Sequence, residues 1–396
     1  MPHFRQSAND HHDYIVGLRR HFHQHPELSL KEQDTAELIK EELAKLGVPF
    51  ITVGDYGIVA TIEGQRTDQM VALRADMDAL PICEENAHLD YCSQNHGVMH
   101  ACGHDGHVAM LLGAAKLLHA DRASLNGTVK LCFQQAEEVG KGAQEILDEL
   151  DKHPIKSVFA IHLWSEIESG KISVEAGPRM AQSEALEITI TGMGCHGATP
   201  NLGVDPILTA AALVMNLSAM MSREIRAVDP SILTFGKIQS GTMGNIIPGT
   251  ATLFGTLRTV NQGVRAHLKE AILRFADFTA QAYRATAKVQ WVGGVPVVRN
   301  DPHCSDIAVA SVRELAGERA VTRFDTMMAS ENYGCFLEKY PGVMAFVGVK
   351  NEACGAIYPH HHPQFNIDEA PLSLGAALHA QYAYNYLQQF NDGATP

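Results

Sequence analysis

Residue types that commonly bind metal ions gather in two short parts of the sequence. Residues 100–107 read HACGHDGH and hold one thiol and three imidazoles, and residues 360–362 are three consecutive histidines. The whole chain contains 21 histidines. Thiolate, imidazole and carboxylate groups together form the ligand set of a borderline-soft divalent ion such as Zn²⁺, with Mn²⁺, Co²⁺ or Ni²⁺ as alternatives. These clusters therefore predict a divalent metal site.

Carboxylates and a further histidine follow predicted strands. Asp76 and Asp78 come after one strand, Glu137 and Glu138 after a second, and His162 ends a third. Working residues of open α/β sheets lie at the carboxyl ends of the strands, so we expect these groups to meet at one rim. Adjacent strand residues point to opposite faces, so we expect the glutamate pair to lie in a turn, where one would bind metal and the other accept a proton from water.

Each of these features also has a purely structural explanation when it is taken singly. A lone cysteine such as Cys102 is more often an inert buried thiol, and a lone histidine is usually a satisfied polar side chain. The pair Glu137 and Glu138 would suit a solvated turn before a helix, because the helix dipole favours negative charge there. The triple histidine at 360–362 would suit a surface loop.

The elements that must position these residues alternate between strands and helices. We expect a helix at residues 29–47, capped by Ser29 with Glu32 three residues later and ended by Gly47. Helices at 106–118 and 142–150 should alternate with strands at 58–62, 70–75, 128–134 and 157–163. This alternation predicts an α/β fold with a mainly parallel mixed sheet and helices on both faces.

Residues 184–292 have a different pattern. Strands expected at 185–191, 231–237, 250–256 and 288–292, with helices at 206–221 and 262–286, give the order of an α+β unit of the split βαβ, ferredoxin-like type. A helix at 302–315, a strand at 343–349 and a helix at 369–389 should return to the first sheet. We therefore predict a catalytic domain in two parts, 1–183 and 293–396, interrupted by an inserted domain at 184–292.

Composition excludes several classes of function. The 396 residues carry 31 Lys and Arg against 45 Asp and Glu, a formal net charge of −14, and this balance argues against nucleic-acid binding. No apolar run approaches the roughly 18 to 20 residues that span a membrane, and residues 1–13 lack the pattern of a secretory signal. The eight scattered cysteines suit reduced thiols. We expect a cytoplasmic protein that acts on a small molecule.

Five motifs in a fixed order resemble a known family. They are residues 74–81 (RADMDALP), 100–107 (HACGHDGH), 134–138 (QQAEE), 195–200 (CHGATP) and 244–248 (GNIIP). Together they are similar to the M20 metallopeptidase family, and more narrowly to its amidohydrolase branch of hippurate hydrolases, N-acyl amino acid amidohydrolases and auxin-conjugate hydrolases. The resemblance implies a catalytic domain with two divalent metal ions per subunit and an inserted lid domain that mediates homodimerisation.

The same resemblance implies a set of metal ligands. Cys102 would bridge the two ions, Glu138 and His361 would complete one site, and His104 and His162 the other. His361 is chosen among the three late histidines because the family's ligand lies two residues before a proline.

The resemblance also implies roles in catalysis and substrate binding. Glu137 would be the general base, and Asp78 would orient a ligand without binding metal itself. His196, from the lid of the partner subunit, would reach the developing oxyanion. Asn245 and Arg258 would hold the carboxylate or acyl oxygen of the substrate.

The sequence departs from its relatives at two places that bear on substrate choice. Residues 330–333 read SENY where relatives read SEDF, and residues 165–168 read SEIE where relatives often carry a loop with proline. The predicted reaction is hydrolysis of an N-acyl amino acid, hippurate-like, to a carboxylate and a free amino acid. The main alternative is a dipeptidase or aminopeptidase-like enzyme, with Glu331 or Glu166 receiving the free amino group. Two alternatives remain. One is a thiol hydrolase with Cys102 as nucleophile and His104 as base, and the other is a non-catalytic metal-binding homologue.

Overall fold

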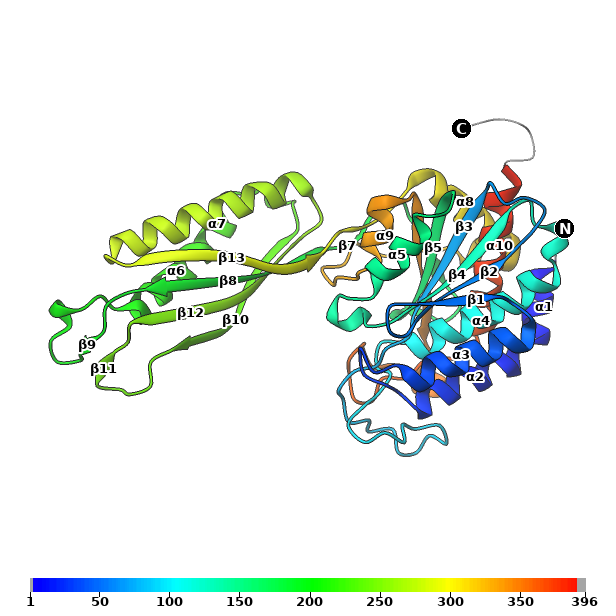
Figure 1. Cartoon of the computed structure of the whole chain (residues 1–396), viewed down its shortest axis with the longest axis horizontal. Helices are drawn as coiled ribbons and strands as arrows, with labels where there is room; N and C mark the ends of the chain where they lie inside the picture. The colour runs from blue at the N-terminus through cyan, green and yellow to red at the C-terminus, as the bar shows by residue number, and fades with distance from the viewer. Residues whose placement is uncertain (1–2, 390–396) are drawn as a thin grey trace. The chain divides into compact units, whose positions relative to one another are not determined.

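The computed structural model describes residues 3–389, which form two compact units (Figure 1). Unit 1 holds the residues up to Arg179, the stretch Arg299–Asp325 and the residues from Asn332 onward. Unit 2 holds Met180–Val298 and the short stretch Thr326–Glu331. The return of residues 326–331 to unit 2 was not predicted, because six residues carry no periodic pattern.

Unit 1 is built on a seven-stranded mixed sheet. Its strand order is β1 (Phe50–Val53), β2 (Gly57–Ile62), β4 (Thr128–Gln134), β3 (Met70–Asp76), β5 (Ile155–Glu168), β15 (Gly342–Lys350) and β6 (Ile172–Ser173). The four strands β4, β3, β5 and β15 pair in parallel, while the outer strands pair antiparallel. The parallel strands therefore present their carboxyl ends at one edge of the sheet.

The α-helices of unit 1 are α1 (Phe4–Asp10), α2 (His12–Gln24), α3 (Gln33–Leu46), α4 (His104–Ala120), α5 (Ala143–Leu150), α8 (Pro302–Ala316), α9 (Gly334–Lys339) and α10 (Leu372–Gln388). Helices α3, α4, α5, α8 and α10 contact this sheet, and the other helices pack on these. Helix α4 is buried on nearly every side because α2, α3 and α10 pack around it against the sheet. Figure 1 shows α5 and α9 on the other side of the sheet from α2, α3 and α4. The α/β class and the mainly parallel sheet are confirmed.

Unit 2 has its own antiparallel sheet and core. The strand order is β10 (Ser231–Ser240), β12 (Thr250–Thr259), β8 (Gln182–Thr191) and β13 (Thr286–Val295). Helices α6 (Pro206–Met221) and α7 (Gln262–Ala282) contribute to one apolar core with this sheet. Two short strands, β9 (Cys195–His196) and β11 (Ile246–Ile247), pair antiparallel. The strands β7 (Gly177–Met180) and β14 (Val298–Asn300) also pair with each other.

Several predicted boundaries differ from the structure. The prediction that Ser29 caps a helix is wrong, since α3 begins at Gln33 and its first amides are bound by the carboxylate of Glu27. Gly47 does end this helix in the left-handed conformation, with φ 74°. The polar helices α1 and α2 were not predicted. Among the described residues no helix has the length and apolar character needed to cross a membrane.

Candidate metal centre

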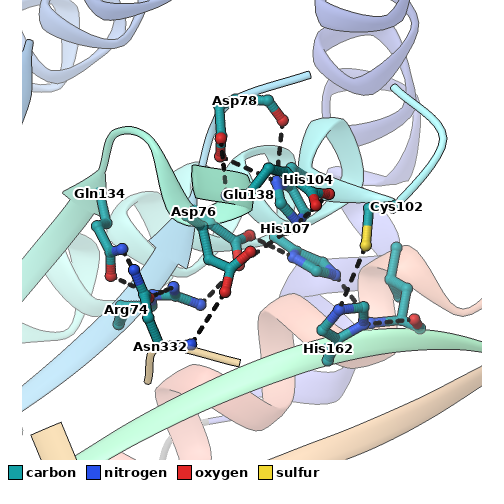
Figure 2. A network of polar contacts seen from close by, with 12 residues as sticks. Arg74, Asp76, Asp78, Cys102, His104, His107, Gln134, Glu138, His162 and Asn332 are labelled. Carbon is teal, nitrogen blue, oxygen red and sulfur yellow. Dashed lines mark hydrogen bonds and ion pairs between the residues drawn. The ribbon is translucent and has the colours of Figure 1, made fainter. Parts of the chain in front are cut away.

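Polar side chains from separate segments of unit 1 meet near the ends of its parallel strands (Figure 2). Asp76 ends β3, and His162 lies within β5. Cys102 precedes α4, whose first residue is His104. Glu138 lies in a short 3-10 turn, Glu137–Val139, after β4, so the prediction that the glutamate pair occupies a turn is confirmed.

The donor atoms form two triads that share one sulfur. Cys102, His104 and His162 make one triad, and Cys102, Glu138 and His361 make the other, with the ligand atoms of each triad within 4.8 Å of one another. The Sγ atom of Cys102 is 3.7 Å from Nε2 of His162, and Nε2 of His361 is 3.6 Å from Oε1 of Glu138. Donors around a tetrahedral zinc ion lie about 3.3–3.8 Å apart. One donor pair in each triad therefore has the spacing found around a bound zinc ion.

The two buried imidazoles are oriented by backbone carbonyl groups. His104 lies with Nδ1 2.9 Å from the carbonyl oxygen of Asp78, and His162 lies with Nδ1 2.7 Å from that of Leu163. If each Nδ1–H donates to its carbonyl, each Nε2 is left as a lone-pair donor to the triad.

Two atoms of the triads lack hydrogen-bond partners. Nε2 of His104 and Oε1 of Glu138 are buried, and neither is hydrogen bonded to another group among the described residues. Buried polar atoms are normally paired, and one cation in each triad would supply the missing partners. The donor set and these two atoms therefore fit a divalent metal.

Burial and neighbouring charges shift the pKa values of the triad residues. Burial, reinforced by Glu138, raises the pKa of the Cys102 thiol well above its ordinary value. Burial opposes protonation of His104, but Asp76 and the Cys102 sulfur raise its pKa well above the ordinary value. Burial, together with His107, lowers the pKa of His162 well below its ordinary value.

Asp76 and His107 lie beside the triads and form a further group of close donor atoms with His104. His107 has Nδ1 2.6 Å from Oδ1 of Asp76, and its Nε2 accepts the amide hydrogen of Leu163 at 2.9 Å. The second oxygen of Asp76 accepts a hydrogen bond from Arg74 at 2.6 Å. Burial would raise the pKa of Asp76, but Arg74 and the two histidines hold it well below its ordinary value. Both ring nitrogens of His107 are thus in use.

Hydrogen bonds with Asp78 and Asn332 hold the turn that carries the glutamates. The amide of Glu138 donates to Oδ2 of Asp78 at 3.0 Å, and the same oxygen accepts the hydroxyl of Ser29 at 2.7 Å. The amide of Asn332 donates to Oε1 of Glu137 at 2.9 Å. Asp78 therefore holds His104 through its carbonyl group and Glu138 through its carboxylate.

Asn332 is a site residue that the sequence marked only as a departure from relatives. Its side-chain oxygen accepts hydrogen bonds from Arg74 at 3.1 Å and from Gln134 at 2.8 Å, and its amide nitrogen donates to the carbonyl of Lys141 at 2.8 Å. The carboxamide thus satisfies donors and acceptors that a carboxylate would not match. Figure 2 shows Asn332 beside Arg74 and Gln134.

The three remaining predicted residues belong to unit 2. His196 on β9 is exposed and pairs with Ile246 of β11, the residue that follows Asn245. The amide of Gly197 donates to the carbonyl of Asn245 at 2.8 Å, so His196 and Asn245 lie on neighbouring segments. Arg258 on β12 donates to the hydroxyl of Ser330 at 2.5 Å.

Comparison with known proteins identifies the family. The model of peptidase family M20/M25/M40 matches residues 72–385, which include both triads. The chain belongs to this family. Because its members hydrolyse amide bonds, the chain is a metal-dependent hydrolase of linear amides.

Individual proteins resemble the chain over nearly its whole length. Thermostable carboxypeptidase 1 of Saccharolobus solfataricus is 38% identical over 94% of this chain and 95% of its own. N-acetyl-L-cysteine deacetylase of Bacillus subtilis is 38% identical over 90% of this chain and 84% of its own. The crystal structure of the Bacillus subtilis YXEP protein, a dinuclear metal-binding peptidase of the M20 family, superposes with a TM-score of 0.85 at 31% identity, covering 96% and 99% of the two chains.

Proposed function

We propose that this M20 hydrolase cleaves the amide bond of N-acyl amino acids and releases a carboxylate and a free amino acid. The observation that carries the proposal is the pair of donor triads sharing Cys102, with Glu137 adjacent to a ligand of one triad. A dinuclear relative and an N-acetyl-L-cysteine deacetylase among the similar proteins support it.

Two divalent ions would occupy the triads. Cys102 would bridge them, with Glu138 and His361 completing one site and His104 and His162 the other. The donor set accepts Zn²⁺, Mn²⁺, Co²⁺ or Ni²⁺. When bound, such ions supply Lewis acidity toward the substrate carbonyl and make a water molecule acidic enough to act as nucleophile near neutral pH.

Glu137 would act as the general base. Its carboxylate takes a proton from the attacking water and delivers it to the departing amide nitrogen. The amide of Asn332 bonds Oε1 of this carboxylate and thereby limits its rotation. The same residue thus serves as base in the first half of the reaction and as acid in the second.

Unit 2 would supply groups that bind the substrate. We propose that it is the lid and dimerisation domain, and that its His196 serves the site of a second copy of the chain by stabilising the oxyanion. Asn245 and Arg258 would bind the carboxylate or acyl oxygen of the substrate, since a guanidinium matches a carboxylate in shape. Sedimentation of the purified protein tests this assembly, and a monomer at micromolar concentration would contradict it.

The similarity to thermostable carboxypeptidase 1 keeps one alternative open. A dipeptidase or carboxypeptidase uses the same chemistry as an N-acyl amino acid hydrolase. It differs in binding an amino acid or peptide, instead of a simple acyl group, on the acyl side of the cleaved amide bond. A substrate panel separates the two functions directly.

The test is release of free amino acids from N-acyl amino acids and dipeptides, with Mn²⁺, Zn²⁺, Co²⁺ or a chelator added. We expect turnover of the acylated substrates that requires metal and falls at least about 10³-fold in Glu137→Ala, because the base is lost. Glu145→Ala, at an exposed position on α5, is the matched control and should retain full turnover. Turnover that survives chelation, or that survives in Glu137→Ala, would contradict the proposal.

A further inference from the structure

We propose that Glu32 is a positioning residue for the turn that carries Glu137 and Glu138. The carboxylate of Glu32 accepts a hydrogen bond from the backbone amide of Ala136, at 2.7 Å. This inference rests on the proposed function, because the turn matters for catalysis only if its glutamates do.

Glu32 is completely buried, although its sequence context suggested a role at the start of a helix. Its side chain makes no capping hydrogen bond to α3, and the amides at the start of that helix are bound by Glu27 instead. The Oε2 atom of Glu32 is also buried and has no hydrogen-bond partner among the described residues. Burying a carboxylate without a hydrogen bond is unfavourable, and the amide of Ala136 supplies such a bond to Glu32 from a distant segment.

Ala136 has an unusual backbone conformation. Its φ is 58°, in the left-handed region that residues with a side chain seldom adopt. Such a conformation persists only where the surroundings hold it in place. Because Ala136 directly precedes the turn, its φ sets the direction in which Glu137 and Glu138 leave β4. The hydrogen bond from its amide to Glu32 acts on this one residue.

Three segments far apart in the sequence therefore hold the turn. Asp78 binds the amide of Glu138, Asn332 binds the carboxylate of Glu137, and Glu32 binds the amide of Ala136. Glu32 lies outside both donor triads and contacts the turn through the backbone amide of Ala136. Removing the carboxylate of Glu32 would leave Glu137 and Glu138 in place in the sequence. It would remove a contact that fixes the backbone conformation on which their orientation depends.

The experiment compares Glu32→Ala, Glu32→Gln and Glu27→Ala with the wild type. Glu27→Ala is the matched control, because it removes a carboxylate of the same segment that binds backbone amides of α3 rather than of the turn. The readouts are kcat and KM for the best substrate of the panel, Mn²⁺ or Zn²⁺ affinity by chelator competition, and the thermal midpoint.

We expect Glu32→Ala to lower kcat about 100-fold with KM changed less than about threefold, since a misplaced reacting group is costly for the chemical step. Its Zn²⁺ affinity should fall about 10-fold, as for the loss of a residue that orients a ligand. Glu32→Gln keeps an acceptor for the Ala136 amide and should recover kcat to within about fivefold of the wild type. Glu27→Ala should lower the thermal midpoint and leave kcat unchanged.

The proposal is overturned if Glu32→Ala has the same kcat as the wild type, or if Glu32→Ala and Glu27→Ala lose kcat equally. It is also overturned if Glu32→Ala folds and the kcat of Glu32→Gln is as low as that of Glu32→Ala. If Glu32→Ala does not fold, a large loss of kcat in folded Glu32→Gln with unchanged metal affinity would also overturn it. Inactivity of the wild type on every substrate is a different result, which counts against the proposed function itself.

Discussion

At the scale of single residues, Cys102 is the group on which both donor triads depend. It is the one residue that they share, and its sulfur lies 3.7 Å from Nε2 of His162. A sulfur that serves two ions couples them, so the loss of this atom should affect both sites together. Substitutions at His162 or His361 should instead affect one site first.

Replacement of Cys102 by serine should remove metal from both sites. We expect Zn²⁺ affinity to fall at least about 100-fold, because a hydroxyl is a much weaker ligand than a thiolate for a borderline-soft ion. Metal content after dialysis and turnover check this expectation. Cys83→Ser is the control, since Cys83 is exposed and belongs to neither triad. Unchanged metal content in Cys102→Ser would show that the sulfur does not bridge.

Residue types and motif order predicted which side chains gather, but not how they are held. The sequence suggested that Ser29 and Glu32 form a helix cap, whereas Ser29 binds Asp78 and Glu32 binds Ala136. The second contact spans 104 residues, and the contact of Asn332 with Glu137 spans 195. Contacts between residues so far apart in the sequence produce no local periodic pattern, so they could not be predicted from the sequence alone.

At the scale of elements, strands were easier to predict than helices on the surface. Strands β3 and β4 are buried at every position, and most of their residues are apolar, which the sequence shows directly. The edge strand β1 is short and exposed at its two central positions, and it was missed. The start of α4 at His104, two residues before the predicted start, was also missed. The left-handed conformation of Gly103, which precedes the helix, could not be read from the sequence pattern.

Position 142, in the turn between β4 and α5, requires glycine. Gly142 has φ 78°, and a Cβ there would lie 1.9 Å from the carbonyl oxygen of Gln135. Gly47 has φ 74° with open space around it. We expect Gly47→Ala to cost about 1 kcal/mol of unfolding free energy and Gly142→Ala about 3 kcal/mol or more, because only the second adds overlap to the left-handed strain.

Urea unfolding of the two variants checks this difference. Gly142→Ala should also lower turnover, since the displaced backbone of Gln135 adjoins Ala136 and the glutamates. Equal stability of the two alanine variants would mean that the turn rearranges freely.

At the scale of the whole molecule, a buried ionic network joins segments of unit 1 behind the metal ligands. His23 on α2 lies 2.7 Å from Asp105 on α4 and 3.1 Å from Glu84, and Arg19 donates to Asp105 at 2.8 Å. Burial alone would raise the pKa of Glu84, but the hydrogen bond and charge of His23 lower it to about 2. Glu84 therefore contributes its part of this stabilisation only while it is ionised.

This shift predicts a loss of stability in acid. A carboxylate whose pKa is lowered on folding contributes stability above its unfolded value, near 4.5, and loses it as the pH falls toward about 2. We expect Glu84 to contribute on the order of 2 kcal/mol at pH 7 after allowance for solvent screening. Urea unfolding at pH 7 and pH 3 should show a smaller decline for Glu84→Gln than for the wild type. Parallel declines in the two proteins would contradict the assignment.

The order of segments in unit 1 also determines when its site can form during synthesis. Strand β15 pairs in parallel with β5, yet the whole of Met180–Val298 lies between them in the chain. His361 follows β15, so the ribosome must deliver unit 2 before the last ligand emerges. Unit 2 can fold first on the nascent chain, while the sheet of unit 1 is incomplete and β5 lacks its partner strand β15. With the proposed ligand set, both metal sites would be complete only after translation has passed residue 361.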